Sequence, residues 1–306
     1  MAFTAKDVQS LREKTGCGMM DCKKALTETD GNMDKAIDFL REKGLAAAAK
    51  KAGRIAAEGL VDCYVEGNIG VIAEVNSETD FVAKNDDFKA FVKGCAITAA
   101  KNNPADVAAL LDMKFEGSKY TVAEMLHEKI LTIGENIKVR RFARVQGNII
   151  TYVHGGGRIG VLVDFDTDTQ TAAKSEFVEM GRNLCMQIAA MSPLYLNREA
   201  VPAEVIEGEK NILIAQIKND EKNKNKPDAI VEKMVQGKIG KYFDTNCLLE
   251  QSFVKDAEIK VAKYVENTAK DLGVNLTVKS FVRYEKGEGL QKREDNFADE
   301  VANMIK

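Results

Sequence analysis

Hydrophobic positions in the first 50 residues recur at helical spacing in three short segments. The first segment begins after Thr4, a good helix-capping residue, and is interrupted by Gly16 and Gly18. A second helix is predicted from about 19 to 29, and a turn at 30–32 precedes a third. The pattern predicts a compact three-helix unit, followed by an alanine- and lysine-rich stretch that favours a helical or partly flexible linker.

Alternating and continuous apolar runs then indicate strands. Residues 60–66 and 69–75 are separated by Gly67-Asn68, a pair typical of a two-residue hairpin turn, and a helical pattern follows over 88–101. The same plan returns later in the chain, where 141–146 and 149–153 flank Gly147-Asn148. A strand at 159–165 and a helix that closes near Pro193 come next. We therefore expect a second hairpin and a duplicated antiparallel αβ core.

The remaining segments do not follow this repeated plan. An amphipathic helix is predicted over 122–133, between the two αβ units, with Gly134 at its end. Apolar residues at roughly heptad spacing on both sides of a polar tip predict an antiparallel helical hairpin over 203–243. Helix 258–270, strand 276–284, a turn at 285–289 and a closing helix at 295–305 complete the prediction.

The predicted fold class is α+β. The expected division is a three-helix domain, a linker, a first core subdomain, a second core subdomain split by the hairpin, and a C-terminal module. The corresponding ranges are 1–50, 51–59, 60–139, 140–202 with 244–284, 203–243 for the hairpin, and 285–306.

Composition narrows the class of protein. The 306 residues carry 44 Lys and Arg against 47 Asp and Glu, and this near-neutral balance argues against specific nucleic-acid binding. No apolar run reaches the roughly 20 residues of a membrane helix, and the N-terminus lacks a secretory segment. Six cysteines without paired spacing and two histidines predict no metal site, and free thiols fit a reducing, cytoplasmic location.

The sequence contains no combination of nucleophile, base and metal ligands at the spacing of a known catalytic motif. His154 precedes three glycines, as in some oxyanion holes, but no G-x-S-x-G nucleophile elbow occurs in the chain. No phosphate-binding glycine loop appears. The carboxylates of Asp86 and Asp87 diverge on a helix. We therefore expect no enzyme activity, no cofactor and no direct nucleotide binding, which leaves a protein that binds partners.

The most informative stretch lies where the strand at 70–75 ends and the helix at 88–101 is about to begin. Its centre is Thr79-Asp80-Phe81-Val82. A Phe at such a junction usually packs into the core. The alternative is that Asp80 and Phe81 project from a rigid corner as a polar group and an apolar anchor for a partner protein. Next to the glycines of the first unit, Met19 and Met20 point in different directions, so one of them is expected at a contact surface.

Five blocks of residues resemble the elongation factor Ts family. The blocks follow the order of the family and span nearly the whole chain. They are Leu11–Leu26 (LREKTGCGMMDCKKAL), Glu74–Ala83 (EVNSETDFVA), Ile133–Ile137 (IGENI), Tyr152–Val161 with its His154-Gly155 and Arg158-Ile159-Gly160, and Gly287–Leu290 (GEGL).

This resemblance implies a guanine-nucleotide exchange factor for the GTPase elongation factor Tu, with an N-terminal domain like ubiquitin-associated domains. It implies that Asp80 and Phe81, flanked by Thr79 and Val82, disturb the magnesium site of the GTPase. Further contacts with the GTPase are implied for Arg12, Met19, Met20, Ile133, Gly134 and His154. The family often has Phe-Val-Met where this chain has Phe253-Val254-Lys255, which leaves that contact unassigned.

Two other functions remain open at this stage. The three-helix unit could serve as an adaptor for ubiquitin-like or other helical ligands, without nucleotide exchange. A nucleic-acid-binding role would show as a steep loss of affinity with salt. Self-association through the helical hairpin is also open, because its apolar stripe is thin and exposed.

Overall fold

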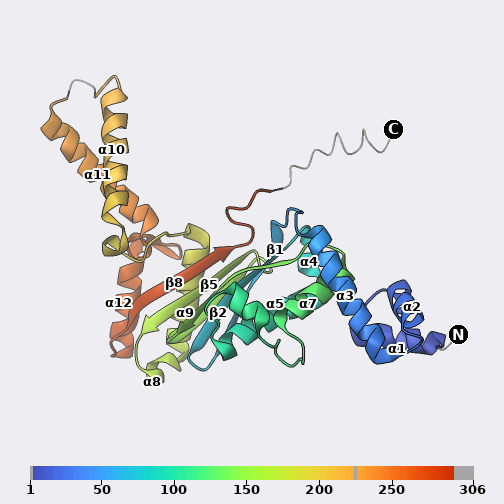
Figure 1. Ribbon diagram of the computed structural model, residues 1–306. Helices are drawn as coiled ribbons and strands as arrows, with labels where there is room; N and C mark the ends of the chain where they lie inside the picture. Colours follow the sequence, from blue (N-terminus) through green and yellow to red (C-terminus); the bar gives the residue numbers. More distant parts are fainter. Residues whose placement is uncertain (1–2, 224–225, 293–306) are drawn as a thin grey trace.

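The computed structural model describes residues 3–223 and 226–292, and it has an α+β fold (Figure 1). The N-terminal unit consists of α1 (Ala5–Thr15), α2 (Met19–Glu28) and α3 (Met33–Lys51). The predicted cap is present, because the Thr4 side chain accepts from the Asp7 N–H and Asp7 accepts from the Thr4 N–H. Helix α3 continues through the alanine-rich run to Lys51, so the helical alternative for the first part of the linker is confirmed.

Two three-stranded antiparallel sheets form the centre of the molecule. The first has the order β1-β2-β3, with β1 at Glu58–Glu66, β2 at Ile69–Ser77 and β3 at Lys138–Gln146. The second has the order β4-β5-β8, and its strands are Asn148–His154, Ile159–Asp166 and Thr277–Glu285. Each sheet has a register shift in its second pairing, after Glu74 and after Asp164. The two sheets therefore share strand order and irregularity.

The predicted hairpin across Gly147-Asn148 is wrong. Strand β3 pairs with β2, and β4 pairs with β5, so the chain passes from one sheet to the other at this point. The Gly147 N–H donates to the Asn68 carbonyl, and a side chain at Gly147 would overlap the Asp164 carboxylate. A Gly-Asn pair indicates that the chain can turn there. Which strands then pair depends on which sheet edges are available to them, here those of β2 and β5. The counterpart of the first hairpin is β4-β5.

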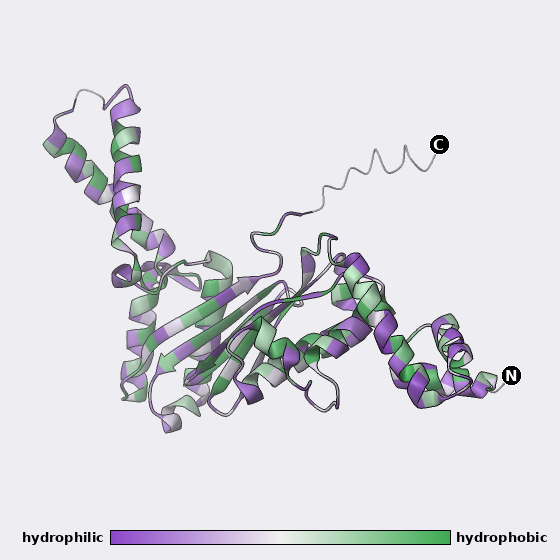
Figure 2. Cartoon of the chain, viewed as in Figure 1, coloured by the Kyte–Doolittle hydropathy of each residue, from purple (hydrophilic) through white to green (hydrophobic). Residues whose placement is uncertain are grey.

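The sheets pack face to face through Val61 and Ile72 on one side and Ile149 and Leu162 on the other. Their close approach depends on glycine: a Cβ at Gly70 would lie 2.5 Å from Ile149 Cγ2. Figure 2 shows the hydrophobic residues gathered on the strands and on the helix faces that cover them.

Helices cover the outer face of each sheet. On the first sheet lie α4 (Asp80–Lys84), α5 (Asp86–Asn102), α6 (Val107–Asp112) and α7 (Val122–Ile133). The second sheet is covered by α9 (Ser175–Met191) and α12 (Val261–Leu272), with α8 (Thr169–Ala172) leading into α9. Helix α12 begins three residues later than predicted, because 256–260 forms a short strand.

The helical hairpin consists of α10 (Ala203–Asn219) and α11 (Asp228–Asn246), and it stands away from the sheets (Figure 1). Its seam is built from Ile217, Val231 and Val235. Short elements connect it to the core, namely η1 (Arg198–Ala200), η2 (Leu248–Glu250), β6 (Ser252–Phe253) and β7 (Asp256–Lys260). The predicted closing helix at 295–305 lies outside the described residues.

Candidate functional site

The corner between β2 and α4 exposes a large aromatic side chain. Phe81 is 77% exposed, whereas its neighbour Val82 is 7% exposed and belongs to the core of the first sheet. Val82 therefore fills the buried position that Phe81 was equally able to take, and the interpretation with Phe81 in the core is wrong. Asp80 and Phe81 both project outward from the first turn of α4.

The corner is held by the carboxylate of Glu135, which follows the end of α7. Glu135 Oε2 accepts the backbone N–H groups of Glu78 and Thr79, each at 3.0 Å, and Oε1 accepts the Thr79 hydroxyl at 2.6 Å. In return, the Glu78 carboxylate accepts the Asn136 N–H at 2.6 Å. Such charge-assisted hydrogen bonds are stronger than neutral ones. The exposed aromatic thus stands on a backbone that is fixed from two directions.

Lys84 completes the surface around Phe81. Its ammonium lies 3.1 Å from the Asp80 carboxylate and 5.5 Å from the centre of the Phe81 ring. The hydrogen bond from Lys84 lowers the pKa of Asp80, so Asp80 is ionised at neutral pH. The corner therefore presents one carboxylate and one aromatic ring side by side. The Lys84 ammonium contacts both of them.

Other predicted site residues lie at positions that differ in exposure. Ile133 is half-buried at the end of α7, and Gly134 ends that helix at a φ of 87°, next to Glu135. Arg12 is exposed on α1, and Met19 and Met20 are 47% and 72% exposed. Both methionines face solvent, although only one was expected to. The structure brings Ile133 and Gly134 to the corner, while the other three lie on the N-terminal unit.

His154 lies at the end of β4, on the turn formed by the three glycines. It is exposed, and its Nδ1 lies 2.9 Å from the Tyr152 hydroxyl. The Gly157 carbonyl accepts the Val61 N–H at 2.8 Å, so the glycine turn joins the two sheets. The start of β1 and the end of β2 are paired, so His154 and the corner belong to the same end of the double sheet.

A buried ionic cluster at this end was missed by the sequence analysis. Glu74 is 0% exposed, and its carboxylate accepts from Arg140, Arg141, Asn76 and the Gly287 N–H. It ties the loop after β8 to the first sheet, three residues before the corner begins. The available signal was an acidic residue inside the apolar run 70–75, because buried carboxylates require partners.

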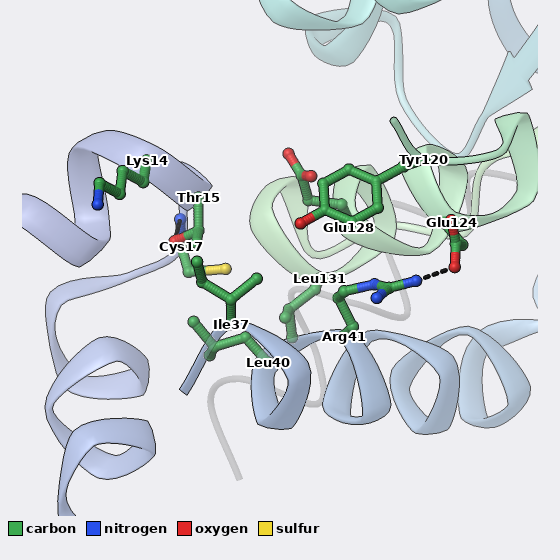
Figure 3. Close-up of a pocket in the computed structure, with 10 residues that line it drawn as sticks. All are labelled: Lys14, Thr15, Cys17, Ile37, Leu40, Arg41, Tyr120, Glu124, Glu128 and Leu131. Carbon is green, nitrogen blue, oxygen red and sulfur yellow. Dashed lines mark hydrogen bonds and ion pairs between the residues drawn. The ribbon is translucent and has the colours of Figure 1, made fainter. Parts of the chain in front are cut away.

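A second joint connects the N-terminal unit to the core (Figure 3). Arg41 of α3 pairs with Glu124 of α7, and its guanidinium lies 4.6 Å from the centre of the Tyr120 ring. Beside them is a cavity of about 60 Å³, and burial raises the pKa of Glu128 at its edge. Since α7 also leads to Glu135, the same helix contacts the N-terminal unit and supports the corner.

Within residues 3–223 and 226–292, no three His, Cys, Asp or Glu side chains are grouped as metal ligands would be. In the same part of the chain, no helix has the length and apolar content needed to cross a bilayer.

The fold and this surface define the class as an α+β protein with an exposed aromatic on a rigid support, an arrangement typical of protein-contact sites. Comparison with known proteins gives the family. Residues 78–288 match the family described as elongation factor TS. Proteins named elongation factor Ts are 51% identical in Syntrophotalea carbinolica, over 100% of both chains, and 50% identical in Clostridium perfringens and Clostridioides difficile, over 99% of both. The chain belongs to the elongation factor Ts family of translation elongation factors.

Proposed function

We propose that this chain is a guanine-nucleotide exchange factor that binds elongation factor Tu in its GDP-bound form and promotes release of GDP. The single observation that carries the proposal is the 77% exposure of Phe81 on a corner clamped by Glu135. It is supported by family membership and by the position of this corner within the matched residues 78–288. The chain itself makes and breaks no covalent bond in this role.

The mechanism is a difference in affinity. A GTPase holds its nucleotide through magnesium and a few oriented groups around the phosphates. A partner that binds the empty GTPase more tightly than the GDP-loaded form weakens GDP binding by the same factor, because linkage is reciprocal. Asp80 and Phe81, flanked by Thr79 and Val82, would insert beside the magnesium site and displace those groups. Each 1.4 kcal/mol of such preference is about tenfold in affinity.

The hydrogen bonds of Glu135 explain how a corner of only a few residues can displace groups of the GTPase. A mobile segment would lose binding free energy to the ordering of its backbone when it docks. Here the Glu135 carboxylate already holds the backbone N–H groups of 78–79, and the Asn136 N–H holds the Glu78 side chain. The contact free energy of the Phe81 ring is then available to displace the groups of the GTPase.

The remaining contacts are proposed on the same end of the molecule and on the N-terminal unit. Arg12, Met19 and Met20 would bind the nucleotide-binding domain of the GTPase, and His154 would touch a neighbouring helix. Ile133 and Gly134 would line the surface beside the corner. Exposed methionines suit such a role, because a flexible thioether adapts to a partner surface.

The domain division and the location are also proposals. We assign 1–50 to a ubiquitin-associated-like domain, 60–139 and 140–202 with 244–284 to the two core subdomains, and 285–306 to a C-terminal module. A translation factor of this kind would act in the cytoplasm. The hairpin leaves Ile212 and Ile230 52% and 45% exposed, and self-association through it is tested by sedimentation with and without Ile212→Asp.

The test of the main proposal is release of a fluorescent GDP analogue from elongation factor Tu. Catalytic amounts of this chain should raise the release rate, and excess unlabelled GDP should dissociate the complex of the two proteins. An unchanged release rate with a folded chain contradicts exchange activity. Binding by residues 1–50 alone, with activity that survives Phe81→Ala, would favour an adaptor instead.

A further inference from the structure

A groove of about 500 Å³ lies beside the corner, on the side of the first sheet where α3 leads into β1. Its walls come from four parts of the chain that are distant in sequence, namely 52–56, Asn76, 138–140 and 290–291. The residues that matter for its chemistry are Arg54, Ile55, Asn76, Lys138, Val139 and Leu290. A groove of this size is in the range of binding sites for a peptide or small molecule.

The groove has an apolar floor with a basic edge. Ile55 is 43% exposed and Leu290 is 37% exposed, although both are large aliphatic side chains. Lys138 is exposed and has no acidic partner among the described residues. Arg54 contributes a second cation, shared with Glu78 at 3.4 Å. An occupant should therefore be amphipathic, with acidic side chains next to apolar ones.

Asn76 adds an independent observation. It is 1% exposed, and its amide nitrogen donates to the Glu58 carbonyl and to Glu74. Its amide oxygen is buried and accepts no hydrogen bond from any residue in the described ranges. Buried acceptors are normally satisfied. One residue of the groove wall, Asn76, thus has a buried amide oxygen without a hydrogen-bond partner among the described residues.

The chain itself supplies a segment with the required chemistry. Leu290 and Gln291 line the groove, and 14 residues outside the described part follow Lys292. Within 294–306, EDNFADEVANMIK, there are four acidic residues against one lysine, a net charge of -3. Phe297, Val301, Met304 and Ile305 recur at i, i+4, i+7 and i+8, the spacing of one helical face.

We propose that residues 294–306 of this chain bind in the groove, with the apolar stripe on Ile55 and Leu290 and the acidic residues near Lys138 and Arg54. Attachment through Leu290 and Gln291 favours this occupant over a second copy, because a short tether gives an effective concentration of about the millimolar range. This inference is independent of the exchange activity proposed above.

The test uses the absence of tryptophan from the chain. Phe297→Trp introduces a single tryptophan, which can be excited selectively, into the segment of the full-length protein. We expect blue-shifted emission and a several-fold lower acrylamide quenching constant than for free tryptophan, unchanged over about a hundredfold dilution. Ile55→Asp or Lys138→Glu in the same background should restore quenching, and Asp299→Lys should counteract Lys138→Glu.

The control is Val65→Asp, which changes a side chain that is 40% exposed on β1 but outside the groove, and it should leave the protection intact. Circular dichroism establishes that each variant is folded. Equal quenching with and without Ile55→Asp overturns the proposal. So does protection that disappears on dilution, which indicates a second copy, or protection that appears only when elongation factor Tu is added. GDP release is measured separately, so failure of either proposal is distinguishable.

Discussion

Glu135 binds Thr79 twice, since its two carboxylate oxygens accept the backbone N–H at 3.0 Å and the side-chain hydroxyl at 2.6 Å. The two residues are 56 positions apart in the chain, and they join the end of α7 to the start of α4. This pair makes the corner that bears Asp80 and Phe81 a rigid part of the core.

Glu135→Gln should loosen the corner. The amide keeps one acceptor oxygen but places an NH₂ group against donors of 78–79, and an unsatisfied donor costs about 1–3 kcal/mol. We expect a lower free energy of unfolding and GDP release several-fold slower than with the unchanged chain. Urea denaturation and the fluorescent GDP assay measure the two effects.

The matched control for this variant is Glu116→Gln, because the Glu116 carboxylate pairs with Lys101 at a more exposed site away from the corner. It should change neither quantity appreciably. Unaltered exchange by folded Glu135→Gln would mean that the clamp is not needed for the action of the corner.

Phe81→Ala should lower the exchange rate while leaving the free energy of unfolding nearly unchanged. A side chain that is 77% exposed contributes little to the fold, so the free energy of unfolding should change by less than about 0.5 kcal/mol. As a binding anchor, Phe81 should contribute about 2 kcal/mol or more of binding free energy, so its loss should lower the exchange rate about thirtyfold or more. Combination with Asp80→Ala should lower exchange further.

Val65→Ala is the control for the aromatic, since Val65 is exposed on the opposite end of the first sheet. It should leave GDP release unchanged. The anchor mechanism is excluded by normal exchange in a folded Asp80→Ala, Phe81→Ala double variant. Loss of the fold in that variant would return Phe81 to a structural role.

Glu74 should make the protein sensitive to acid. Burial alone raises its pKa, but hydrogen bonds from the Gly287 N–H, Asn76 and the two arginines outweigh it, so the pKa lies below the ordinary value. A lowered pKa means that the stabilisation is complete above the pKa of the unfolded chain, about 4.3, and is lost as the pH falls through the folded value.

Glu74→Gln should therefore lower the free energy of unfolding at neutral pH by about 3 kcal/mol or more, because Arg140 and Arg141 lose a buried partner. The difference between the variant and the unchanged chain should shrink as the pH is lowered below about 4.3. Urea denaturation at a series of pH values provides the measurement, with exposed Glu66→Gln as the control. A difference that stays constant with pH would contradict the assignment.

Substitution of two helical glycines by alanine should change the stability of the protein in opposite directions. A Cβ at Gly94 in α5 would overlap the ring of Phe115, whereas one at Gly237 in α11 meets no atom within 4 Å. Gly94→Ala should destabilise the protein by about 1–3 kcal/mol through overpacking. Gly237→Ala should stabilise its helix by up to about 1 kcal/mol. Thermal unfolding of both variants is sufficient, and equal shifts would contradict the packing at Phe115.

Helix boundaries were predictable because their signals are local. The Thr4 cap, the Gly16 interruption and the Gly134 terminus each depend on a few neighbouring residues, and the structure confirms all three. The α+β class followed from the same local periods. The identity of the candidate corner was also visible, since the strand end, the acid and the aromatic occur together at 76–82.

Strand pairing and the direction of individual side chains were not predictable in the same way, because they depend on residues distant in the sequence. Gly147-Asn148 resembles Gly67-Asn68, yet it connects two sheets, because β2 and β5 offer edges that β3 and β4 fill. Similarly, Phe81 and Val82 were both apolar candidates for the core, and the packing against β1 and α5 selected Val82. The role of Glu74 required Gly287, which is 213 residues away.

The sequence by itself therefore determined most of the helices and longer strands and the family to which the chain belongs, because these depend on short-range periodicity and on motifs in order. Only the tertiary structure decided which strands pair, which of two adjacent apolar side chains faces solvent, and what holds the corner in place. Those outcomes arise from competition among surfaces distant along the chain, and that competition is resolved only when the two sheets and their helices pack together.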